Sequence, residues 1–428
     1  MRVSSLLLLS LAACTPRVEG IAAEPEDQAS TAPEAGDGTD GQTEGPSEPR
    51  PIQDDDVEDV PAGEPTSRPG DQVFDLRVIH SVEVDISEAG IASLTSEPRE
   101  WVVADVQVDG EAFSQVGVRV KGRLGSQRSI RGKAALKLDF LEFGQDQRLD
   151  GLEKLNLNNM VQDCAKIKEL AAYGIHELTG TPAPRVAYAH VWVNGDDRGI
   201  YTLVEQQDDV FLKGRFADPT GTLYDGDYFM HADRSYTLVD FRSELVDLFE
   251  QDEGEDVARA DLRAVAEALE RGDALDGALA DLVDIDQLAR FIAATAWTGH
   301  SDSYVYYSNN YRAYFDPARD GRMVLLPWDP DWAFYAGTSL GSPYGVLAQR
   351  CFADVPCFAK VQDAVADLSV ALEDGVLMGK LEAAMDLVTA DVLRDPYLEH
   401  GRSEVEACQA DVVAWFDRRD WDLASAGF

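Results

Sequence analysis

The chain has 428 residues, 45% of them apolar, so it can bury a core of two or three domains or one two-lobed unit. Acidic side chains number 79 against 37 basic ones, which gives a net charge of −42. This surplus argues against a nucleic-acid-binding protein, because the phosphate backbone requires a basic face. The five cysteines include no C-x-x-C pair, which disfavours both a zinc module and a disulfide-dense mini-scaffold.

The first fourteen residues have the pattern of an export signal. Arg2 is followed by a leucine-rich run, and the segment ends in Leu-Ala-Ala-Cys with Cys14 last. The apolar run is too short to cross a bilayer, which takes about 20 residues. Its end resembles the lipobox of bacterial lipoproteins, although a plain signal peptide with an incidental cysteine is the alternative. We therefore expect an exported protein, anchored through a lipid at Cys14 to the membrane of the bacterial cell envelope or surface.

Export has a consequence for the other four cysteines, because an oxidising compartment allows them to form disulfides. Cys351 and Cys357 could close a small loop, which leaves Cys164 and Cys408 as the remainder. Four cysteines allow more than one connectivity, so the sequence leaves the pairing open.

Residues 15–71 have the composition of a disordered, acidic, proline-rich tether. They contain nine of the 19 prolines and no aromatic residue, and their 16 acidic and three basic side chains give a net charge of −13. Such a segment cannot bury enough apolar area to offset the entropy lost on ordering.

Residues 72–205 predict a β-rich first lobe. Val-rich, period-two runs at Trp101–Val108 and Val116–Lys121 are separated by a turn at Asp109-Gly110. Further strands are expected at Lys133–Phe140, Arg185–Val193 and Gly199–Glu205, with a two-glycine loop at 122–126. The helical spacing of Lys166–Leu178 predicts one helix among them, stopped by Gly180 and Pro182.

Residues 206–428 predict a mainly helical second lobe. Apolar positions follow a 3.6-residue period over 255–298 and again from Lys360 onward. Between these helical stretches, Tyr311–Phe315 and Met323–Leu326 are typical of a short hairpin. Strands with one helix, followed by helices around one hairpin, indicate an α+β fold of two lobes with a cleft between them.

Carboxylates and amides of the second lobe are the strongest candidates for chemistry. Asp329 and Asp331 flank a proline directly after an apolar strand, where a carboxylate would be poorly solvated. With Asn309 and Asn310 they supply the hard oxygen ligands that Mg²⁺ prefers. Asp302 could orient an attacking hydroxyl and accept its proton. This set suits metal-assisted phosphoryl transfer, although a D-x-D pair is more often a turn or a solvated edge.

The first lobe offers cations for phosphate groups. Lys121 precedes the two-glycine loop, and Lys133 and Lys137 lie on the strand after it. One of these lysines could neutralise phosphates, held by Glu169 on the following helix, as in the strand–helix ion pair of kinases. The alternative for each lysine is a solvated strand edge.

Seven segments, taken in chain order, resemble the CotH kinases, a family named after spore coat protein H. They include the pattern N-G…G-x-Y-T-L-x-E-Q and the pattern P-W-D-x-D. The segments are Val118–Gly122, Lys133–Phe140, Gly151–Leu157, Pro182–Arg185, Val193–Gln206, Asn309–Tyr311 and Leu326–Asp331.

The resemblance implies an atypical, two-lobed protein-kinase-like fold and ATP-dependent phosphorylation of protein Ser or Thr with Mg²⁺ or Mn²⁺. In the family pattern Asp302 matches the catalytic-loop aspartate, Asp329 the metal-binding aspartate and Asn310 a second metal ligand. Glu205 lies where the chain passes between the lobes, near the adenine.

Two other functions compete with a kinase of exported or cell-surface proteins. One is a non-catalytic surface protein, for adhesion or as a scaffold, that keeps the fold. The other is a metal-dependent hydrolase that uses the same carboxylates with a metal-bound water and no adenine pocket. Convergence of Asp302, Asn310 and Asp329 on one site would favour the kinase.

Overall fold

A computed structural model describes residues 68–428, apart from positions 124, 234 and 256–257. Contacts within the chain separate Met1–Gly63 from a second unit, Glu64–Phe428. The expected signal segment, Cys14 and most of the expected tether lie outside the described residues. Residues 68–71 belong to the folded unit, because Gly70 is buried and donates its amide to the carbonyl of Asp150 at 2.7 Å. The folded part therefore begins before the expected boundary at 71.

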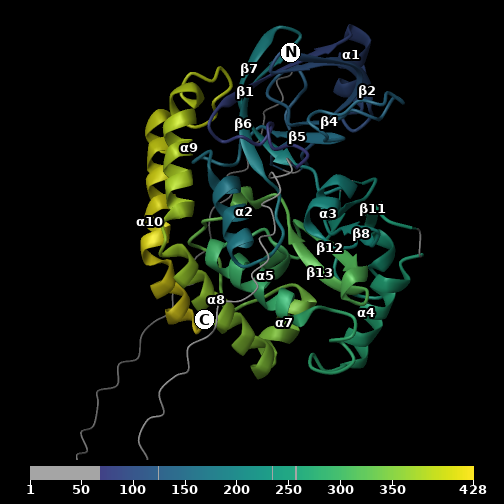
Figure 1. Cartoon of the computed structure of the whole chain (residues 1–428), viewed down its shortest axis with the longest axis vertical. Helices are drawn as coiled ribbons and strands as arrows, with labels where there is room; N and C mark the ends of the chain where they lie inside the picture. The colour runs from purple at the N-terminus through teal and green to yellow at the C-terminus, as the bar shows by residue number, and fades with distance from the viewer. Residues whose placement is uncertain (1–67, 124, 234, 256–257) are drawn as a thin grey trace, which may run out of the picture. The chain divides into compact units, whose positions relative to one another are not determined.

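Seven strands of the first lobe form a closed barrel in the order β1-β2-β3-β4-β5-β7-β6 (Figure 1). Neighbours are antiparallel except β1 and β6, whose parallel pairing closes the barrel. Closure leaves no free edge for pairing with another chain. The strands are β1 (Ile79–Ile86), β2 (Val102–Val108), β3 (Glu111–Val120), β4 (Leu136–Asp139), β5 (Lys154–Asn158), β6 (Val186–Val193) and β7 (Asp196–Glu205).

The alternating side chains of these strands separate the barrel core from the outer face. Leu136 and Leu138 of β4 are fully buried in the barrel core, whereas Lys137 between them points away from it. The expected strands of the first lobe are confirmed within a few residues. A second helix, α1 (Glu88–Ser96), lies in the first lobe, where the sequence predicted one helix only. Ser87 caps α1 by accepting a hydrogen bond from the Gly90 amide at 3.1 Å.

The second lobe contains a four-stranded sheet in the order β11-β8-β12-β13 and a small hairpin, β9-β10. The expected hairpin is confirmed as β12 and β13, and β8 and β11 extend it into a sheet that the sequence did not indicate. The strands are β8 (Thr222–Asp225), β9 (Phe229–Met230), β10 (Tyr236–Thr237), β11 (Glu250–Glu253), β12 (Tyr311–Asp316) and β13 (Arg322–Pro327).

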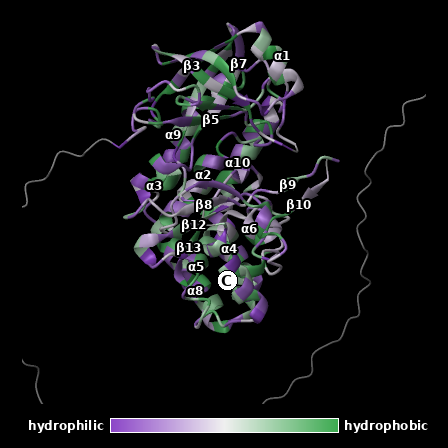
Figure 2. Ribbon diagram, turned by 90° about the vertical axis from the view of Figure 1, so that its right-hand side faces the viewer, coloured by the Kyte–Doolittle hydropathy of each residue, from purple (hydrophilic) through white to green (hydrophobic). Residues whose placement is uncertain are grey.

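Helices make up most of the rest of the described chain, and Figure 2 shows polar and apolar residues mixed along them. The α-helices are α2 (Lys168–Leu178), α3 (Asp209–Arg215), α4 (Ala260–Arg271), α5 (Ile285–Thr298), α6 (Tyr304–Tyr307), α7 (Val346–Ala353), α8 (Val355–Leu372), α9 (Val376–Val392) and α10 (Arg402–Ala426). Short 3₁₀ turns lie at η1 (Val246–Leu248), η2 (Pro317–Arg319) and η3 (Pro330–Trp332). None of the described helices is both long and apolar enough to cross a bilayer.

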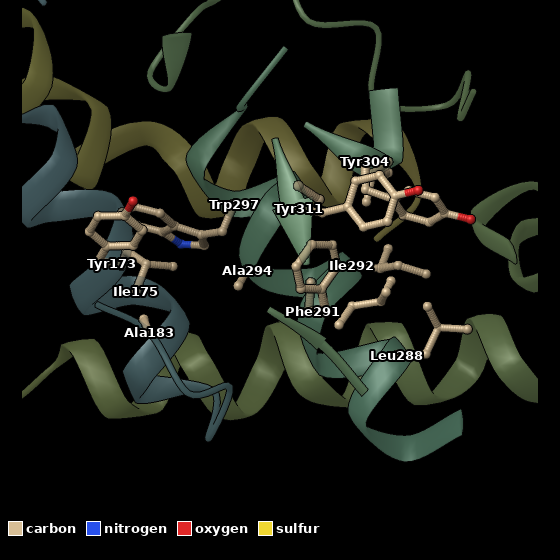
Figure 3. Close-up of a cluster of buried hydrophobic side chains, with 14 of the residues drawn as sticks. Tyr173, Ile175, Ala183, Leu288, Phe291, Ile292, Ala294, Trp297, Tyr304 and Tyr311 are labelled. Atoms are coloured by element: carbon tan, nitrogen blue, oxygen red, sulfur yellow. The ribbon is translucent and has the colours of Figure 1, made fainter. Parts of the chain in front are cut away.

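The helical core does not follow the chain order, because α2 joins it from between two barrel strands. Tyr173 and Ile175 of α2 belong to the same buried cluster as Phe291 and Trp297 of α5 (Figure 3). Most buried side chains of the barrel strands form a separate core, although Tyr188 of β6 and Val204 of β7 belong to the cluster of α2. Helix α2 is therefore fixed to the second lobe, and residues at its start lie where the two lobes meet.

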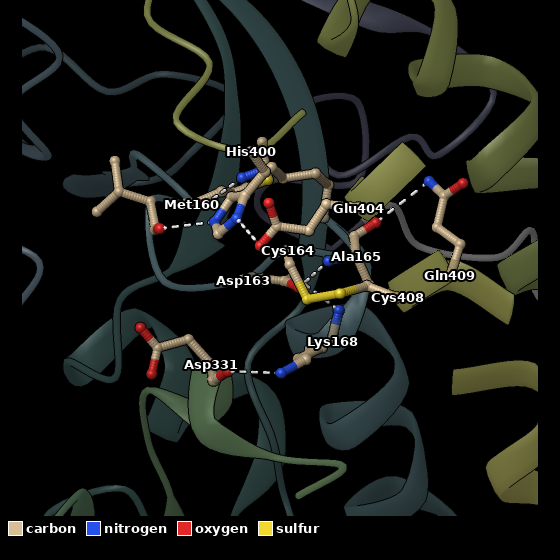
Figure 4. Close-up of a disulfide and its surroundings, with 12 residues drawn as sticks. Met160, Asp163, Cys164, Ala165, Lys168, Asp331, His400, Glu404, Cys408 and Gln409 are labelled. Atoms are coloured by element: carbon tan, nitrogen blue, oxygen red, sulfur yellow. Dashed lines mark hydrogen bonds and ion pairs between the residues drawn. A yellow bond between two sulfur atoms is a disulfide. The ribbon is translucent and has the colours of Figure 1, made fainter. Parts of the chain in front are cut away.

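Both disulfides are present in the structure. Cys164, just before α2, is joined to Cys408 of α10, and Cys351 of α7 is joined to Cys357 of α8. Near the first bridge, Gln409 donates to the Ala165 carbonyl at 3.2 Å (Figure 4). The long-range bridge ties the segment before α2 to the C-terminal helix.

Candidate active site

Asp302 lies in the turn between α5 and α6, where amide side chains hold its carboxylate. Gly299 ends α5 in the left-handed conformation, with φ of 59°, and Ser303 caps α6. The Asn309 amide group donates to both oxygens of Asp302 at 3.2 Å, and that of Asn310 donates to one at 2.9 Å. Burial, with a smaller contribution from the charge of Asp329, raises the pKa of Asp302 to about 6. The expected grouping of these three residues is therefore present.

Asp329 and Asp331 follow β13 and enter the 3₁₀ turn η3. Asp329 has φ of 43°, and its backbone amide donates to the Tyr173 hydroxyl at 3.1 Å. Lys168 donates to the backbone carbonyl of Asp331 at 3.4 Å (Figure 4). Within the described part of the chain, neither carboxylate has a hydrogen-bond or ion-pair partner. Burial, and then the neighbouring charge of Asp329, raises the pKa of Asp331.

Lys121 and Glu169 are connected through a third residue, Asn158 at the end of β5. The Asn158 side-chain oxygen accepts a hydrogen bond from the Lys121 ammonium, and its amide group donates to Glu169 at 2.6 Å. Burial, followed by the charge of Asp329, raises the pKa of Glu169 to about 8. The ammonium of Lys121 also lies 5.1 Å from the ring centre of Trp328. The expected lysine–glutamate pair is thus indirect.

One cavity of about 230 Å³ brings together seven of the ten residues expected to act in catalysis, metal binding or ATP binding. These are Lys121, Lys137, Asp302, Asn309, Asn310, Asp329 and Asp331. Glu169 lines a small adjoining cavity with Lys121 and both aspartates of the 3₁₀ turn. Lys137 is partly buried, and this burial lowers its pKa to about 8.

The structure does not bring the two remaining residues, Lys133 and Glu205, into this cavity. The ammonium of Lys133 is buried in an ion pair with Asp395 and donates to the Ile200 carbonyl at 2.8 Å. Glu205 is held by Arg185 at 2.6 Å and by Arg215 at 3.0 Å. Both are structural ion pairs in this geometry, and the neighbouring Gln206 lines the cavity instead of Glu205.

Two residues that line the cavities were not identified from the sequence: Arg312 in the larger cavity and Asn158 in the small adjoining one. Asn158 carries the link between Lys121 and Glu169, and the guanidinium of Arg312 lies 4.9 Å from the ring centre of Trp328. Arg312 is buried between Asp225, at 3.3 Å, and Asp252. A signal existed for Arg312, which is a basic side chain followed by Ala313, Tyr314 and Phe315. Asn158 lies in a strand where polar and apolar residues alternate, so its sequence did not distinguish it.

The donor groups fit a divalent cation that is shared with phosphate. No group of three or more His, Cys, Asp or Glu side chains among the described residues is arranged to hold a metal unaided. Mg²⁺, however, usually takes one or two carboxylates and completes its shell with phosphate and water. Asp329 and Asp331 are two unpartnered carboxylates close together, which agrees with that use.

Comparison with known proteins gives one family. A sequence model of the CotH kinase protein family matches residues 118–364. Inner spore coat protein H of Bacillus subtilis (strain 168) is 23% identical over 200 residues, which cover 45% of this chain and 52% of that protein. The chain thus spans about half the length of this curated relative.

A solved structure of HipA from Shewanella oneidensis MR-1, in complex with HipB and operator DNA, also matches. It covers 69% of this chain and 66% of that chain, at 13% identity and a TM-score of 0.31, which is too low to support an argument about the fold. The family match, by contrast, extends over more than half of the chain and includes every residue of the cavity that carries candidate chemistry. The resemblance expected from the sequence is confirmed, and the chain belongs to the CotH kinase protein family.

Proposed function

We propose that this protein transfers the γ-phosphoryl group of ATP to Ser or Thr hydroxyls of exported or cell-surface proteins, with Mg²⁺ or Mn²⁺. The observation that carries the proposal is the single cavity lined by Asp302, Asn310, Asp329 and Lys121. A base, a pair of carboxylates for metal and a phosphate-binding cation are the parts that phosphoryl transfer requires.

Asp302 is the group that orients the acceptor hydroxyl and takes its proton. Its raised pKa of about 6 keeps it ionised at neutral pH while making it a better proton acceptor than an ordinary aspartate. Asn309 and Asn310 fix the orientation of its carboxylate. Both polar atoms of the Asn309 side chain already form hydrogen bonds: its nitrogen donates to Asp302, and its oxygen accepts from the Tyr228 backbone amide at 3.2 Å. We therefore assign Asn309 to positioning Asp302 instead of to metal binding.

Asp329 and Asp331 are the residues that would hold the metal, with the side-chain oxygen of Asn310 as a further ligand. When bound, the metal neutralises charge on the phosphates. Lys121 supplies a fixed positive charge for the phosphates. Its position is restrained because it donates to Asn158, which in turn donates to Glu169. Lys137 adds a second cation on the same wall of the cavity, which we assign to the nucleotide.

The location follows from the N-terminal sequence and the cysteines. The lipobox-like end at Cys14 supports export and a lipid anchor, and two disulfides suit an oxidising compartment. The acidic surplus of the chain supports protein, not nucleic acid, as the acceptor.

The direct test is transfer of label from γ-labelled ATP, with Mg²⁺ or Mn²⁺, by the full chain and by Asp329→Ala. The matched control is Asp363→Ala, which changes an exposed aspartate on α8. Labelled protein or acceptor that is lost only in Asp329→Ala supports the kinase. Absence of both label and any thermal shift with nucleotide and metal would contradict it and favour a non-catalytic binding protein.

A further inference from the structure

Three arginines line the active-site cavity together with the metal carboxylates. Arg99, Arg119 and Arg123 all contribute to the cavity of about 230 Å³. Arg99 and Arg123 also line a wider cleft of about 960 Å³ that adjoins it at Gly122. That cleft is lined by none of Lys121, Asp302, Asp329 or Asp331. Arg99 and Arg123 therefore lie where the catalytic cavity meets open space large enough for a polypeptide segment, whereas Arg119 lines the catalytic cavity alone.

The positive charge of these arginines is only partly balanced. Among the described residues, neither Arg99 nor Arg119 has a carboxylate partner: Arg99 donates to the Gly122 carbonyl at 3.4 Å, and Arg119 lies 4.6 Å from the ring centre of Trp101. Arg123 has Asp227 at 3.4 Å. Burial, and then the charges of Arg123 and Arg119, lowers the pKa of Arg99, so the three guanidinium groups repel one another. This is unusual in a chain with 79 acidic and 37 basic side chains.

Three of the carboxylates that line the cavity already have arginine partners. Asp225 and Asp252 are bound to Arg312, and Asp227 is already the partner of Arg123. An anion brought in from outside would balance Arg99 and Arg119. Guanidinium groups bind carboxylate and phosphate through paired, charge-assisted hydrogen bonds, so these are the anions that fit.

We propose that Arg99, Arg119 and Arg123 form an acceptor subsite that binds a carboxylate or phosphate lying close in sequence to the target hydroxyl. The inference rests on the proposed kinase activity and names its substrate class: polypeptide segments with an acidic or already phosphorylated residue beside Ser or Thr. The ATP phosphates have their own partners in Lys121 and the metal carboxylates. Tyr228, Phe229 and Met230, which line the wider cleft, offer apolar surface for the rest of the segment.

The test compares four peptides that differ only beside one serine: glutamate, phosphoserine, glutamine and lysine. Their kcat/KM is measured with the full chain, with Arg99→Gln/Arg119→Gln, and with Arg77→Gln, whose arginine is exposed and paired with Asp75. We expect the glutamate or phosphoserine peptide to be preferred over glutamine by about tenfold. The preference should vanish in the double variant and remain in the control, with the KM for ATP unchanged.

Comparison of the glutamate and phosphoserine peptides shows whether the subsite takes a carboxylate or a phosphate. A strong preference for the phosphoserine peptide would mean that the acceptor must already be phosphorylated. Fluorescence anisotropy of the labelled peptides without nucleotide reports binding even where no transfer occurs. Failure of transfer with retained, arginine-dependent binding would refute the kinase activity alone. Equal use and equal binding of all four peptides, or a double variant that raises only the KM for ATP, would overturn the subsite.

Discussion

The ion pair of Lys133 with Asp395 allows a sharp test, because it joins the barrel to the chain after α9. The two side chains are 7% and 2% exposed. The Asp395 carboxylate also accepts from the Ile200 amide at 3.1 Å and from the Tyr397 amide at 2.8 Å. The surroundings of the Asp395 carboxylate therefore stabilise its negative charge, which pairs with Lys133. We expect Lys133 to contribute to stability and not to ATP binding.

The loss in free energy of unfolding depends on which buried charge each substitution leaves without its partner. Asp395→Ala leaves a buried ammonium that keeps the Ile200 carbonyl and the face of the Tyr201 ring but has no counter-ion, and breaking a buried pair in this way costs about 3–5 kcal/mol. Lys133→Met should cost less, because the carboxylate keeps its two amide donors. In the double variant no unpaired ammonium remains, so its loss of stability should be smaller than the sum of the single losses by about 2 kcal/mol.

The assay is urea unfolding of the full chain and the three variants, together with ATP binding measured by thermal shift. Lys133→Met should keep its affinity for ATP, whereas Lys121→Met should lose most of it. If the losses of stability in the two single variants add up to the loss in the double variant within about 0.5 kcal/mol, the coupling between Lys133 and Asp395 is refuted. An equal loss of ATP affinity in Lys133→Met and Lys121→Met would refute the assignment of Lys133 to structure.

Three further predictions test other parts of the structure. Gly199→Ala should destabilise the protein about as much as Asp395→Ala, because a Cβ at φ of +74° would lie 2.0 Å from the Asp395 carboxyl carbon; an unchanged melting temperature would contradict this. Asn158→Leu removes the link between Lys121 and Glu169 and should lower kcat/KM for ATP by about tenfold, whereas unaltered kinetics would show that the link is not needed. Burial raises the pKa of Asp208, which caps α3, from 3.8 to about 7, so the folded state loses stability as the pH rises from about 4 through 7. Asp208→Asn keeps the cap without the charge, and its advantage in urea unfolding should grow over that pH range to a few kcal/mol, about 1.4 kcal/mol per unit of pKa shift; an advantage independent of pH would contradict the raised pKa.

Local patterns were sufficient wherever a structure or a group of side chains depends on neighbours in the sequence. Period-two runs predicted the strands β2 and β3, and Asp302, Asn309 and Asn310, which lie close in the sequence, were expected to belong to one site. The apolar strand before Asp329 likewise indicated a poorly solvated carboxylate. Helix α1 was missed, because its nine residues carry only a weak amphipathic pattern.

By itself, then, the sequence determined most strands of the first lobe, the two-lobed α+β class, the family and seven of the residues that line the cavity. Only the tertiary structure decided which lysine faces the carboxylates, because β4 carries Lys137 toward the cleft while Lys133 meets an aspartate 262 residues further along the chain. It also decided the closure of the barrel, the link through Asn158 and the neighbouring arginines. The physical reason is that a buried charge takes its partner from whichever distant segment packs against it, and no local pattern in the sequence records that choice.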